Sequence, residues 1–269
     1  MKPISKTAFY CCGVRMRDAE RDKPVCGDVY AKVFMNEDGL RILETFKDET
    51  GPNSSNVARH RIIDDLLRQE LAAHPDLRVV IIGAGFDTRA YRLKRGTWIE
   101  LDEPQVMAYK NERLPVSDCQ NELERIAIDF STDSLEDKLS PFAGRSGPVV
   151  VVVEGVFMYL EQQAIEQLLQ TLRRLFPKHK LICDLMTRKF FEKYGRTIHE
   201  KLTGMGATFK FTADNPKEIF ISNGYARVDQ ISMVQKSTEF EGRKVPKIVF
   251  KTFLRTLASG YAIYVFETK

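Results

Sequence analysis

The feature that most constrains the fold is a run of five valines, Val149 to Val153. The run has no alternation of polar and apolar residues, so the strand that it predicts is buried on both faces, as in a parallel sheet covered by helices. Three further apolar runs of this kind cover residues 77–82, 98–101 and 180–185. Two stretches between or after them carry apolar residues at helical spacing, 58–73 and 161–176. Alternating strands and helices predict a doubly wound α/β sheet.

The end of the chain has a different pattern. Residues 225–234 and 261–268 predict two more strands, with no clear crossover helix between them, and we expect an antiparallel pair at the sheet edge. No repeat or linker divides the 269 residues, which predicts a single domain. Its parts are expected to be a lid at 1–57, a core at 58–185, a polar and aromatic substrate cap at 186–214, and the C-terminal part of the sheet at 215–269.

Composition excludes several classes of protein. Lys and Arg number 41 against 37 Asp and Glu, a net charge of +4, and no basic stripe interleaved with aromatics points to nucleic acid. The five cysteines form no C-x-x-C pair and lie far from the four histidines in sequence, so no metal site is expected. No apolar run is long enough to span a membrane, and no secretory signal follows the N-terminus. We expect a cytoplasmic protein with reduced thiols.

A glycine loop follows the predicted strand at 77–82. Gly83, Ala84 and Gly85 allow a sharp turn and a close approach of the backbone to a ligand. In open α/β sheets, cofactors bind in the crevice at the carboxyl ends of the strands. Thr88 stands where the dinucleotide fingerprint needs its third glycine, which argues against a nicotinamide-dependent oxidoreductase.

Acidic residues follow the neighbouring strands at the same edge. Asp102 lies 19 residues after Gly83, near the offset at which a carboxylate meets ribose hydroxyls, with Glu100 as its rival. Asp129 ends the strand-like piece 126–130, where it either accepts the adenine amine or caps a helix. Glu154 ends the valine strand. Three acids around one crevice fit a pyrophosphate poorly and a sulfonium nucleoside well, so they favour S-adenosylmethionine (SAM), with S-adenosylhomocysteine (SAH) as product.

Three motifs carry a family resemblance. Gly83-Ala-Gly-Phe-Asp-Thr-Arg-Ala-Tyr-Arg-Leu93, Glu100-Leu-Asp-Glu-Pro104 and Glu154-Gly-Val-Phe-Met-Tyr-Leu160 resemble the leucine carboxyl methyltransferase family, within it the bacterial polyketide-type O-methyltransferases. The motifs occur in the family's order and spacing, and the resemblance covers roughly residues 5–185. It implies a class I SAM-dependent methyltransferase fold and activity.

The resemblance also implies roles for single residues. Arg59 matches the arginine that meets the methionine carboxylate of SAM, and Glu154 matches the acid near the methionine amino group. The remaining matches are Gly83 for the first glycine of the loop, Asp102 for the ribose, and Asp129 with Phe130 for the adenine. Arg15 resembles a basic residue that also reaches the cofactor. Here the sequence departs from the family, because Met16 replaces an alanine and Asp28-Val-Tyr-Ala31 replaces Asp-Pro-x-Ala.

The predicted reaction is methyl transfer to an oxygen atom. A carboxylate is ionised at neutral pH and needs no general base, which fits a sequence without an evident His-Asp or Lys-Tyr dyad. We therefore expect a methyl ester on a small-molecule carboxylic acid, formed without metal, with Tyr159 near the transferred methyl. A phenol or alcohol acceptor would need a base, for which His199 is the leading candidate.

Three alternatives stay open beside this expectation. A protein C-terminal carboxylate is a second kind of acceptor, because the predicted cap at 186–214 carries no motif that would distinguish it. A catalytically silent SAM-binding protein is the second alternative. A methyltransferase acting on nucleic acid is disfavoured, since Glu154-Gly-Val-Phe157 stands where such enzymes carry an N-P-P-Y-like tetrapeptide.

Overall fold

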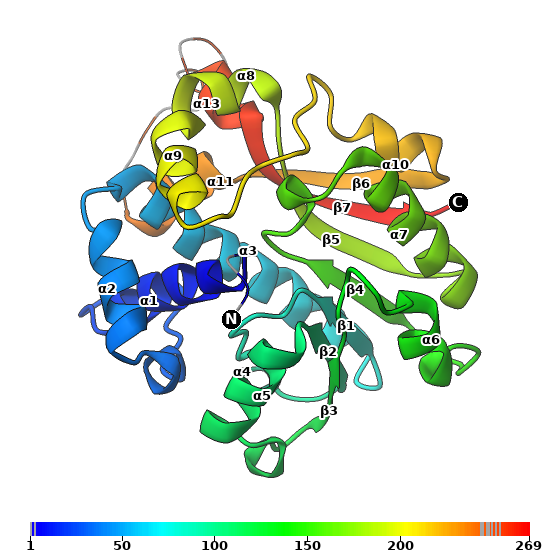
Figure 1. The fold of residues 1–269 in the computed structure, drawn as a ribbon. Coiled ribbons are helices and arrows are strands. Elements are labelled where there is room, and N and C mark those ends of the chain that lie inside the picture. Colours follow the sequence, from blue (N-terminus) through cyan, green and yellow to red (C-terminus); the bar gives the residue numbers. More distant parts are fainter. Residues whose placement is uncertain are drawn as a thin grey trace.

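The computed structural model describes residues 2, 4–242, 245, 248, 250, 252 and 254–269. They form a seven-stranded sheet in the order β3-β2-β1-β4-β5-β7-β6 (Figure 1). The strands are β1 Arg78–Ile82, β2 Thr97–Asp102, β3 Glu122–Ala127, β4 Val149–Val153, β5 Lys180–Met186, β6 Tyr225–Ser232 and β7 Tyr261–Thr268. Strands β1 to β5 are parallel, and β7 pairs antiparallel with both β5 and β6. The predicted α/β class is confirmed.

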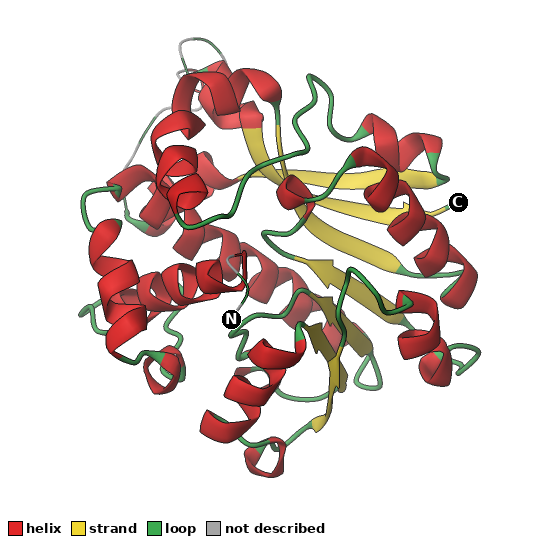
Figure 2. Ribbon diagram, viewed as in Figure 1, coloured by secondary structure: helices red, strands yellow, loops and turns green. Residues whose placement is uncertain are grey.

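Helices pack on both sides of this sheet (Figure 2). The longer helices are α1 Thr7–Ala19, α2 Glu37–Thr45, α3 Thr50–Ala73, α5 Pro104–Arg113, α7 Gln162–Leu175, α9 Arg196–Gly204 and α11 Met233–Phe240. The shorter ones are α4 Arg89–Arg92, α6 Leu135–Leu139, α8 Arg188–Phe190, α10 Glu218–Ser222 and α13 Arg255–Gly260.

The five valines explain why the sheet is covered twice. All five are buried, and because successive side chains of a strand point to opposite faces, they divide between two cores. Val150 and Val152 pack with residues of α3 and α5, whereas Val149, Val151 and Val153 pack with residues of α7. The uninterrupted apolar run therefore marks a central strand between two helical layers.

The structure corrects the prediction for the C-terminal part. Strand β6 ends at Ser232, whose hydroxyl accepts a hydrogen bond from Gln235 N–H and so starts α11. The expected antiparallel pairing of the last two strands is confirmed, and the segment between them, which the sequence analysis left without a clear helix, contains α11 and α13. Helix α11 is only eight residues long, which is too short for a helical repeat to be recognised in the sequence. β7 is inserted between β5 and β6, which leaves β6 as the edge strand.

Two further boundaries differ from the prediction. Residues 1–57 contain α1, α2 and the start of α3, which begins at Thr50 rather than at residue 58. β3 ends at Ala127, so Asp129 stands two residues beyond the strand. Helices α8, α9, α11 and α13 gather above α3 (Figure 1), so the segment between β6 and β7 joins the predicted cap region. No described helix combines the length and the apolar character needed to cross a membrane.

Candidate functional site

Two adjoining cavities lie at the carboxyl ends of the parallel strands. The first, here called the strand-end cavity, has a volume of about 240 Å³. Its walls come from the loops after β1, β2, β3 and β4 and from the helices α1 and α3. They include Arg15, Arg59, His60, Gly83, Ala84, Gly85, Asp102, Glu103, Phe130, Glu154 and Gly155. Most of the predicted site residues therefore come together here. This is the edge at which open α/β sheets bind their ligands.

The glycine loop fits the chemistry that the sequence predicts. Gly83 has φ +70, and a Cβ built on it would stand 2.5 Å from Cγ2 of Val156, so another side chain would displace the β4 loop. Gly85 also has positive φ, and its N–H donates to Oδ2 of Asp102 at 2.6 Å. The loop thus leaves bare backbone along the strand-end cavity and holds the carboxylate of Asp102 against it.

Asp102 has the environment of a ligand-binding acid. Its side chain is buried, and Oδ1 accepts a hydrogen bond from Glu103 N–H at 2.7 Å. Burial raises the pKa of Asp102 to about 6, against the lowering effect of the two backbone hydrogen bonds. The rival acid Glu100 does not line the cavity, because its Oε2 pairs with Lys110 Nζ at 2.7 Å and with Arg125 Nε at 2.9 Å.

Of the two residues predicted for the adenine side, Phe130 lines the strand-end cavity and Asp129 does not. Phe130 lines the cavity with 43% of its surface exposed. Asp129 is not among the described lining residues. Its Oδ1 accepts hydrogen bonds from Lys2 Nζ at 2.8 Å and from Ser131 N–H at 3.0 Å, which hold its pKa below the usual range. Lys2 also reaches Oε2 of Glu103 at 2.8 Å and so bridges two acids.

Glu154 is a buried anion held by two guanidinium groups. Its Oε2 accepts from Arg89 Nη2 at 2.8 Å and its Oε1 from Arg59 Nε at 3.0 Å, and these charges hold its pKa well below the usual range against the penalty of burial. Oxygen and nitrogen atoms of His60, Asp87 and Glu154 lie within 4.8 Å of one another. The guanidinium of Arg89 contacts all three side chains, while Arg59 contacts Glu154 and Arg92 contacts His60, so arginine side chains supply the positive charge at this cluster.

Arg15 lies behind the glycine loop. Its Nε donates to Oδ2 of Asp28 at 2.9 Å, and its Nη2 donates to the carbonyl of Phe86 at 2.7 Å. The departure from the family pattern around Asp28 therefore leaves this ion pair intact. Arg15 lines the strand-end cavity and ties α1 to the loop after β1.

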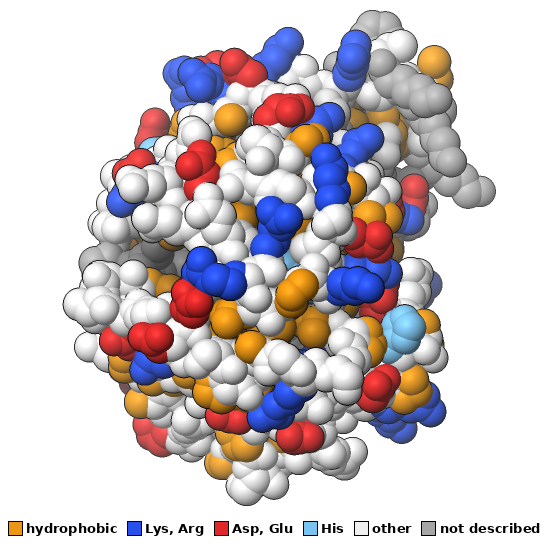
Figure 3. Space-filling model, turned by 90° about the vertical axis from the view of Figure 1, so that its right-hand side faces the viewer, with side chains coloured by type: hydrophobic (Ala, Val, Ile, Leu, Met, Phe, Trp, Pro, Cys, Tyr) orange, Lys and Arg blue, Asp and Glu red, His pale blue; other side chains and the backbone are white. Residues whose placement is uncertain are grey.

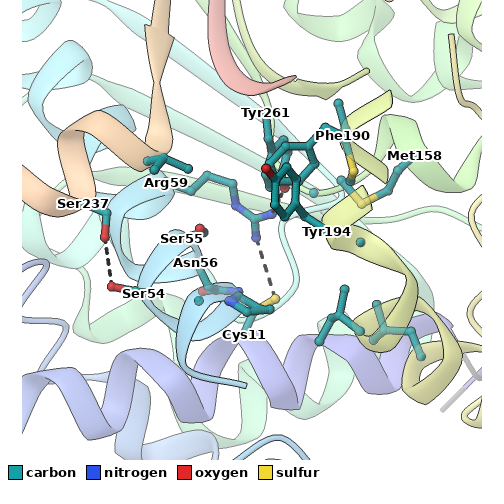
Figure 4. Close-up of a pocket in the computed structure, with 18 of the residues that line it drawn as sticks. Cys11, Ser54, Ser55, Asn56, Arg59, Met158, Phe190, Tyr194, Ser237 and Tyr261 are labelled. Atoms are coloured by element: carbon teal, nitrogen blue, oxygen red, sulfur yellow. Dashed lines mark hydrogen bonds between the residues drawn. The ribbon is translucent and has the colours of Figure 1, made fainter. Parts of the chain in front are cut away.

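The second cavity, here called the helix-lined cavity, has a volume of about 530 Å³ (Figure 4). One wall comes from the start of α3 and from α11, with Thr50, Ser54, Ser55, Asn56, Ser237, Thr238 and Glu241. The opposite wall is apolar and aromatic, with Met158, Met186, Phe190, Tyr194, Ile198, Leu202 and Phe209. The two cavities share five lining residues, Thr7, Cys11, Arg59, Gly155 and Tyr159.

Arg59 is the centre of this junction. The side chain is buried, and its Nη1 donates to the hydroxyl of Tyr261 at 3.0 Å and to Oδ2 of Asp184 at 3.3 Å. Its Nη2 contacts Sγ of Cys11 at 3.7 Å, the contact drawn as a dashed line in Figure 4. Nε and Nη1 of Arg59 are thus bound to Glu154 and Asp184, whereas Nη2 contacts only the thiol of Cys11, which is a weak acceptor.

Asp184 and Tyr261 belong to the site although sequence reasoning did not single them out. Oδ1 of Asp184 accepts from Gly155 N–H at 2.6 Å, and Oδ2 accepts from the hydroxyl of Tyr261 at 2.7 Å. Asp184 is an acid inside the apolar run at 180–185, which was a usable signal. Tyr261 starts β7 far along the chain, and only the antiparallel pairing with β5 brings it to Asp184.

The two predicted catalytic residues lie in different surroundings. Tyr159 lines both cavities, and burial raises the pKa of its hydroxyl, which therefore keeps its proton. His199 lies against the rings of Phe191 and Phe209, and its Nε2 accepts from Phe209 N–H at 3.1 Å. His199 is not among the described residues that line either cavity.

Surface charge shows no dominant sign on the face drawn in Figure 3. Basic and acidic side chains are interspersed there around small apolar patches. This face therefore carries no patch of a single charge.

Comparisons with known proteins identify the family. The family model described as leucine carboxyl methyltransferase matches residues 8–173. Over 224 residues the chain is 27% identical to the tetracenomycin polyketide synthesis O-methyltransferase TcmP of Streptomyces glaucescens, covering 80% of this chain and 77% of that protein. It is 31% identical over 182 residues to a putative SAM-dependent methyltransferase of Mycolicibacterium paratuberculosis, covering 61% of this chain and 60% of the relative.

Solved structures show the same fold at low identity. A DUF574 family protein from Streptomyces avermitilis aligns with a TM-score of 0.61 and 11% identity, over 90% of this chain and 96% of that one. The magnesium protoporphyrin IX methyltransferase ChlM of Synechocystis, solved with SAH, aligns with a TM-score of 0.50 and 13% identity, over 81% and 87%. The sheet order, the glycine loop and the family match agree with one another. The chain belongs to the leucine carboxyl methyltransferase family and is a SAM-dependent methyltransferase.

Proposed function

We propose that the chain is an O-methyltransferase that esterifies a carboxylate of a small-molecule acceptor. SAM occupies the strand-end cavity and the acceptor occupies the helix-lined cavity. The observation that carries this proposal is the junction, where both cavities meet at Arg59, Gly155 and Tyr159. A transferable methyl group held at the junction faces the acceptor from one side and the cofactor from the other, and positioning of this kind supplies most of the rate of a displacement.

The nucleoside part of SAM fits the loops after β1 and β2. Asp102 keeps lone pairs on both oxygens beyond its backbone hydrogen bonds, so it can accept the ribose hydroxyls. The bare backbone from Gly83 to Gly85 allows the close approach that this requires. Phe130 offers an exposed ring to the adenine. Lys2 and Ser131 already hold the carboxylate of Asp129, so we assign the adenine side to Phe130 and a supporting position to Asp129.

The amino acid part of SAM fits the charges at β4. The ionised Glu154 attracts the ammonium group, and Nη2 of Arg59 supplies a donor for the carboxylate. Arg15 holds the loop after β1 through the carbonyl of Phe86. When bound, SAM supplies the methyl group that an acceptor oxygen takes up, with the electron pair of the broken bond left on sulfur.

The helix-lined cavity favours a carboxylate over a phenol or alcohol. Its described lining contains no histidine or lysine, and its carboxylate, Glu241, accepts a hydrogen bond from the hydroxyl of Ser54. The hydroxyls of Tyr159 and Tyr261 have raised pKa values, so they stay protonated. Both carboxylate oxygens of Asp184 already accept hydrogen bonds, from Gly155 N–H, Arg59 Nη1 and the hydroxyl of Tyr261, so this acid is engaged in holding the junction. A carboxylate is ionised at neutral pH and needs no base.

The test is binding followed by product analysis. Calorimetry of the purified protein with SAM, SAH and NADH measures the choice of cofactor, and Asp102→Ala is the control. We expect the parent protein to bind SAM and SAH but not NADH, and we expect Asp102→Ala to lose this binding. Mass spectrometry of aromatic carboxylic acids and of a peptide with a free C-terminus, incubated with SAM, then detects methylation. Mild base cleaves a methyl ester and leaves a methyl ether intact. A base-stable product, or methylation of the peptide alone, would overturn the small-acid proposal.

A further inference from the structure

The helix-lined cavity has a second boundary besides the junction. A third cavity of about 340 Å³, lined by residues of α1, α2, α3 and α11, shares Thr50, Ser54, Ser237 and Glu241 with it. We call these four residues the distal boundary. No described residue lines both the third cavity and the strand-end cavity, so the distal boundary and the junction have no residue in common. A part of the acceptor that meets the distal boundary is therefore not the part that meets the methyl group.

The hydrogen bonds at the distal boundary have a fixed direction. The hydroxyl of Ser54 donates to a carboxylate oxygen of Glu241 and lies 2.9 Å from Oγ of Ser237, the contact drawn as a dashed line in Figure 4. A carboxylate only accepts, so the single proton of the Ser54 hydroxyl points to Glu241. Ser54 has no second proton to give, so Ser237 donates to Ser54. The chain of hydrogen bonds runs from Ser237 through Ser54 and ends on Glu241.

This direction decides what the α11 side of the cavity offers to a ligand. Both serine protons are used within the chain, whereas each oxygen keeps at least one lone pair. Thr238 also lines the cavity, and its hydroxyl donates to the carbonyl of Gln235 at 2.7 Å, so it too is left with lone pairs. The side chains of Ser54, Ser237, Thr238 and Glu241 are partly exposed, so a ligand can reach them. Together they offer hydrogen-bond acceptors and no donor.

A hydrogen-bond donor is the ligand group that suits such a surface. A hydroxyl or N–H group can donate to the lone pairs, whereas a carbonyl or ether oxygen would face other lone pairs. A second carboxylate would also meet the charge of Glu241. The hydroxyls of Thr50 and Ser55, which line the cavity from α3, can turn to donate or to accept, so they do not oppose a donor.

We infer that the distal boundary determines acceptor specificity, and that the acceptor is a carboxylic acid with a hydroxyl or N–H group remote from the carboxylate that is methylated. The inference rests on the proposed function for the choice of the helix-lined cavity as the acceptor site. It adds a second feature by which the chain selects among acids. A site built to pair with a hydroxyl group discriminates strongly against analogues that lack it, because its own polar groups are then left unpaired.

The experiment uses three frames of different length, so that the span between the two groups is measured. They are 4-hydroxybenzoic, 6-hydroxy-2-naphthoic and 4′-hydroxybiphenyl-4-carboxylic acid, each paired with the analogue that carries fluorine in place of the hydroxyl group. Fluorine is similar in size and cannot donate. We expect the parent enzyme to prefer the hydroxy acid by at least about tenfold in kcat/KM on at least one frame. On that frame, the dicarboxylic acid should be a poorer acceptor than the fluoro acid by at least about tenfold.

The deciding variant is Glu241→Gln, which keeps the size of the side chain. Its amide can donate to Ser54, so the chain of hydrogen bonds can reverse and turn a proton toward the cavity. The preference for the hydroxy acid should fall by at least about threefold, and the dicarboxylic acid should gain at least about tenfold relative to the fluoro acid. Glu239→Gln is the matched control, because Glu239 is exposed on α11 and pairs with Lys236, and it should change neither ratio by more than about twofold.

Two outcomes overturn the inference. Equal rates for the hydroxy and fluoro acids on all three frames do so without any variant. Ratios that Glu241→Gln leaves unchanged do so as well, whereas a gain for the dicarboxylic acid cannot come from general damage to the fold. If Glu241→Gln does not melt cooperatively, Ser237→Ala takes its place and must lower the preference for the hydroxy acid. Its control is Ser222→Ala on α10, whose hydroxyl donates to the carbonyl of Ile219.

A failure of the proposed function looks different. In that case SAH binds but none of the acids is esterified. Calorimetry of the hydroxy and fluoro acids with SAH-loaded protein then measures recognition directly. Tighter binding of a hydroxy acid that Glu241→Gln weakens supports the recognition step alone, whereas equal or absent binding of all the acids overturns it.

Discussion

The strand-end cavity and the helix-lined cavity are built on different principles. Much of the first is formed by loops that directly follow strands, so the sheet itself fixes Gly83, Asp102 and Glu154, and α1 and α3 complete its walls. The second is formed mainly by side chains of helices and of the segment between β6 and β7, which helix packing brings together. In the proposed assignment, cofactor binding therefore depends mainly on loops at the ends of the sheet strands, and the selection of an acceptor depends mainly on how the helices pack.

Charge divides the two cavities as well. The strand-end cavity holds buried acids balanced by guanidinium groups, whereas the described lining of the helix-lined cavity is mostly neutral. Arg59 belongs to both, because it balances Glu154 on one side and Asp184 on the other. Substitutions at this boundary should therefore affect both cavities, and those farther away should affect one.

The largest effect is expected for Arg59→Leu. Removing one partner of a buried ion pair leaves uncompensated charge, which costs about 3–5 kcal/mol in the free energy of unfolding. We also expect loss of measurable SAH binding and of turnover. Thermal melting and calorimetry measure both, with Arg68→Leu as the control, since that α3 side chain is 47% exposed and its ion pair with Asp65 should contribute less than about 1 kcal/mol. If Arg59→Leu bound SAH with the affinity of the parent protein, Arg59 would not contribute to cofactor binding in the strand-end cavity.

The next effect concerns the pH dependence of the strand-end cavity alone. Because the pKa of Asp102 is about 6 in the folded chain, the free protein protonates it in mild acid, and the protonated form loses acceptors for ribose hydroxyls. SAH affinity should fall by up to about tenfold per pH unit below pH 6. Calorimetry from pH 5 to pH 8, on the parent protein and on Asp102→Asn, measures this. An affinity that stays flat across this range would show that Asp102 does not contact the ligand.

The same group predicts the opposite trend for stability. An acid with a raised folded pKa binds its proton more tightly in the folded chain than in the unfolded one, where the pKa is about 3.9. Its contribution to stability is therefore complete below pH 4 and is lost as the pH rises through about 6. In Asp102→Asn this component of the pH dependence of unfolding should disappear.

A smaller effect is expected for Asp184→Asn. The amide can still accept from Gly155 N–H, but it removes the charge that faces Arg59 and the best acceptor for the hydroxyl of Tyr261. Because the junction loosens while the loops after β1 and β2 stay, kcat should fall by about 10- to 100-fold, with a change of only a few-fold in the KM for SAM. Tyr261→Phe should show the same pattern more weakly. A fall confined to cofactor affinity would place Asp184 in the strand-end cavity instead.

The comparison of the cavities also explains what could be predicted from the sequence. Gly83, Asp102 and Glu154 stand at the ends of three strands that could be predicted from their apolar runs. Because parallel strands place their carboxyl ends at the same edge of the sheet, these local patterns were enough to predict that the three residues lie together. Asp129 differs from these three residues, because β3 ends at Ala127 and the carboxylate of Asp129 accepts hydrogen bonds from Lys2 and Ser131.

The helix-lined cavity had no comparable signal. Its members come from α1, α3, η5 (Phe157–Tyr159), α8, α9 and α11, which are far apart in sequence and meet only through packing. Tyr261 reaches Asp184 because β7 inserts beside β5, a pairing that no residue pattern in 225–268 announces. Helix α11 spans only eight residues, too few to show a helical repeat in the sequence, so the residues that it adds to the cavity were missed.

The smallest effect is expected for His199→Ala, paired with Tyr159→Phe. The Nε2 of His199 accepts a backbone hydrogen bond from Phe209, so it is occupied as an acceptor and lies outside the described cavity linings. His199→Ala should therefore cost about 1 kcal/mol of stability and change kcat by less than about threefold.

Tyr159→Phe alters the wall that both cavities share and should lower kcat by about tenfold, measured as initial rates of ester formation. A pH-dependent loss of rate in His199→Ala, with Tyr159→Phe unaffected, would mean that the acceptor is a hydroxyl group and that α9 moves His199 toward it on binding, because only such an acceptor has a proton that a neutral imidazole must take.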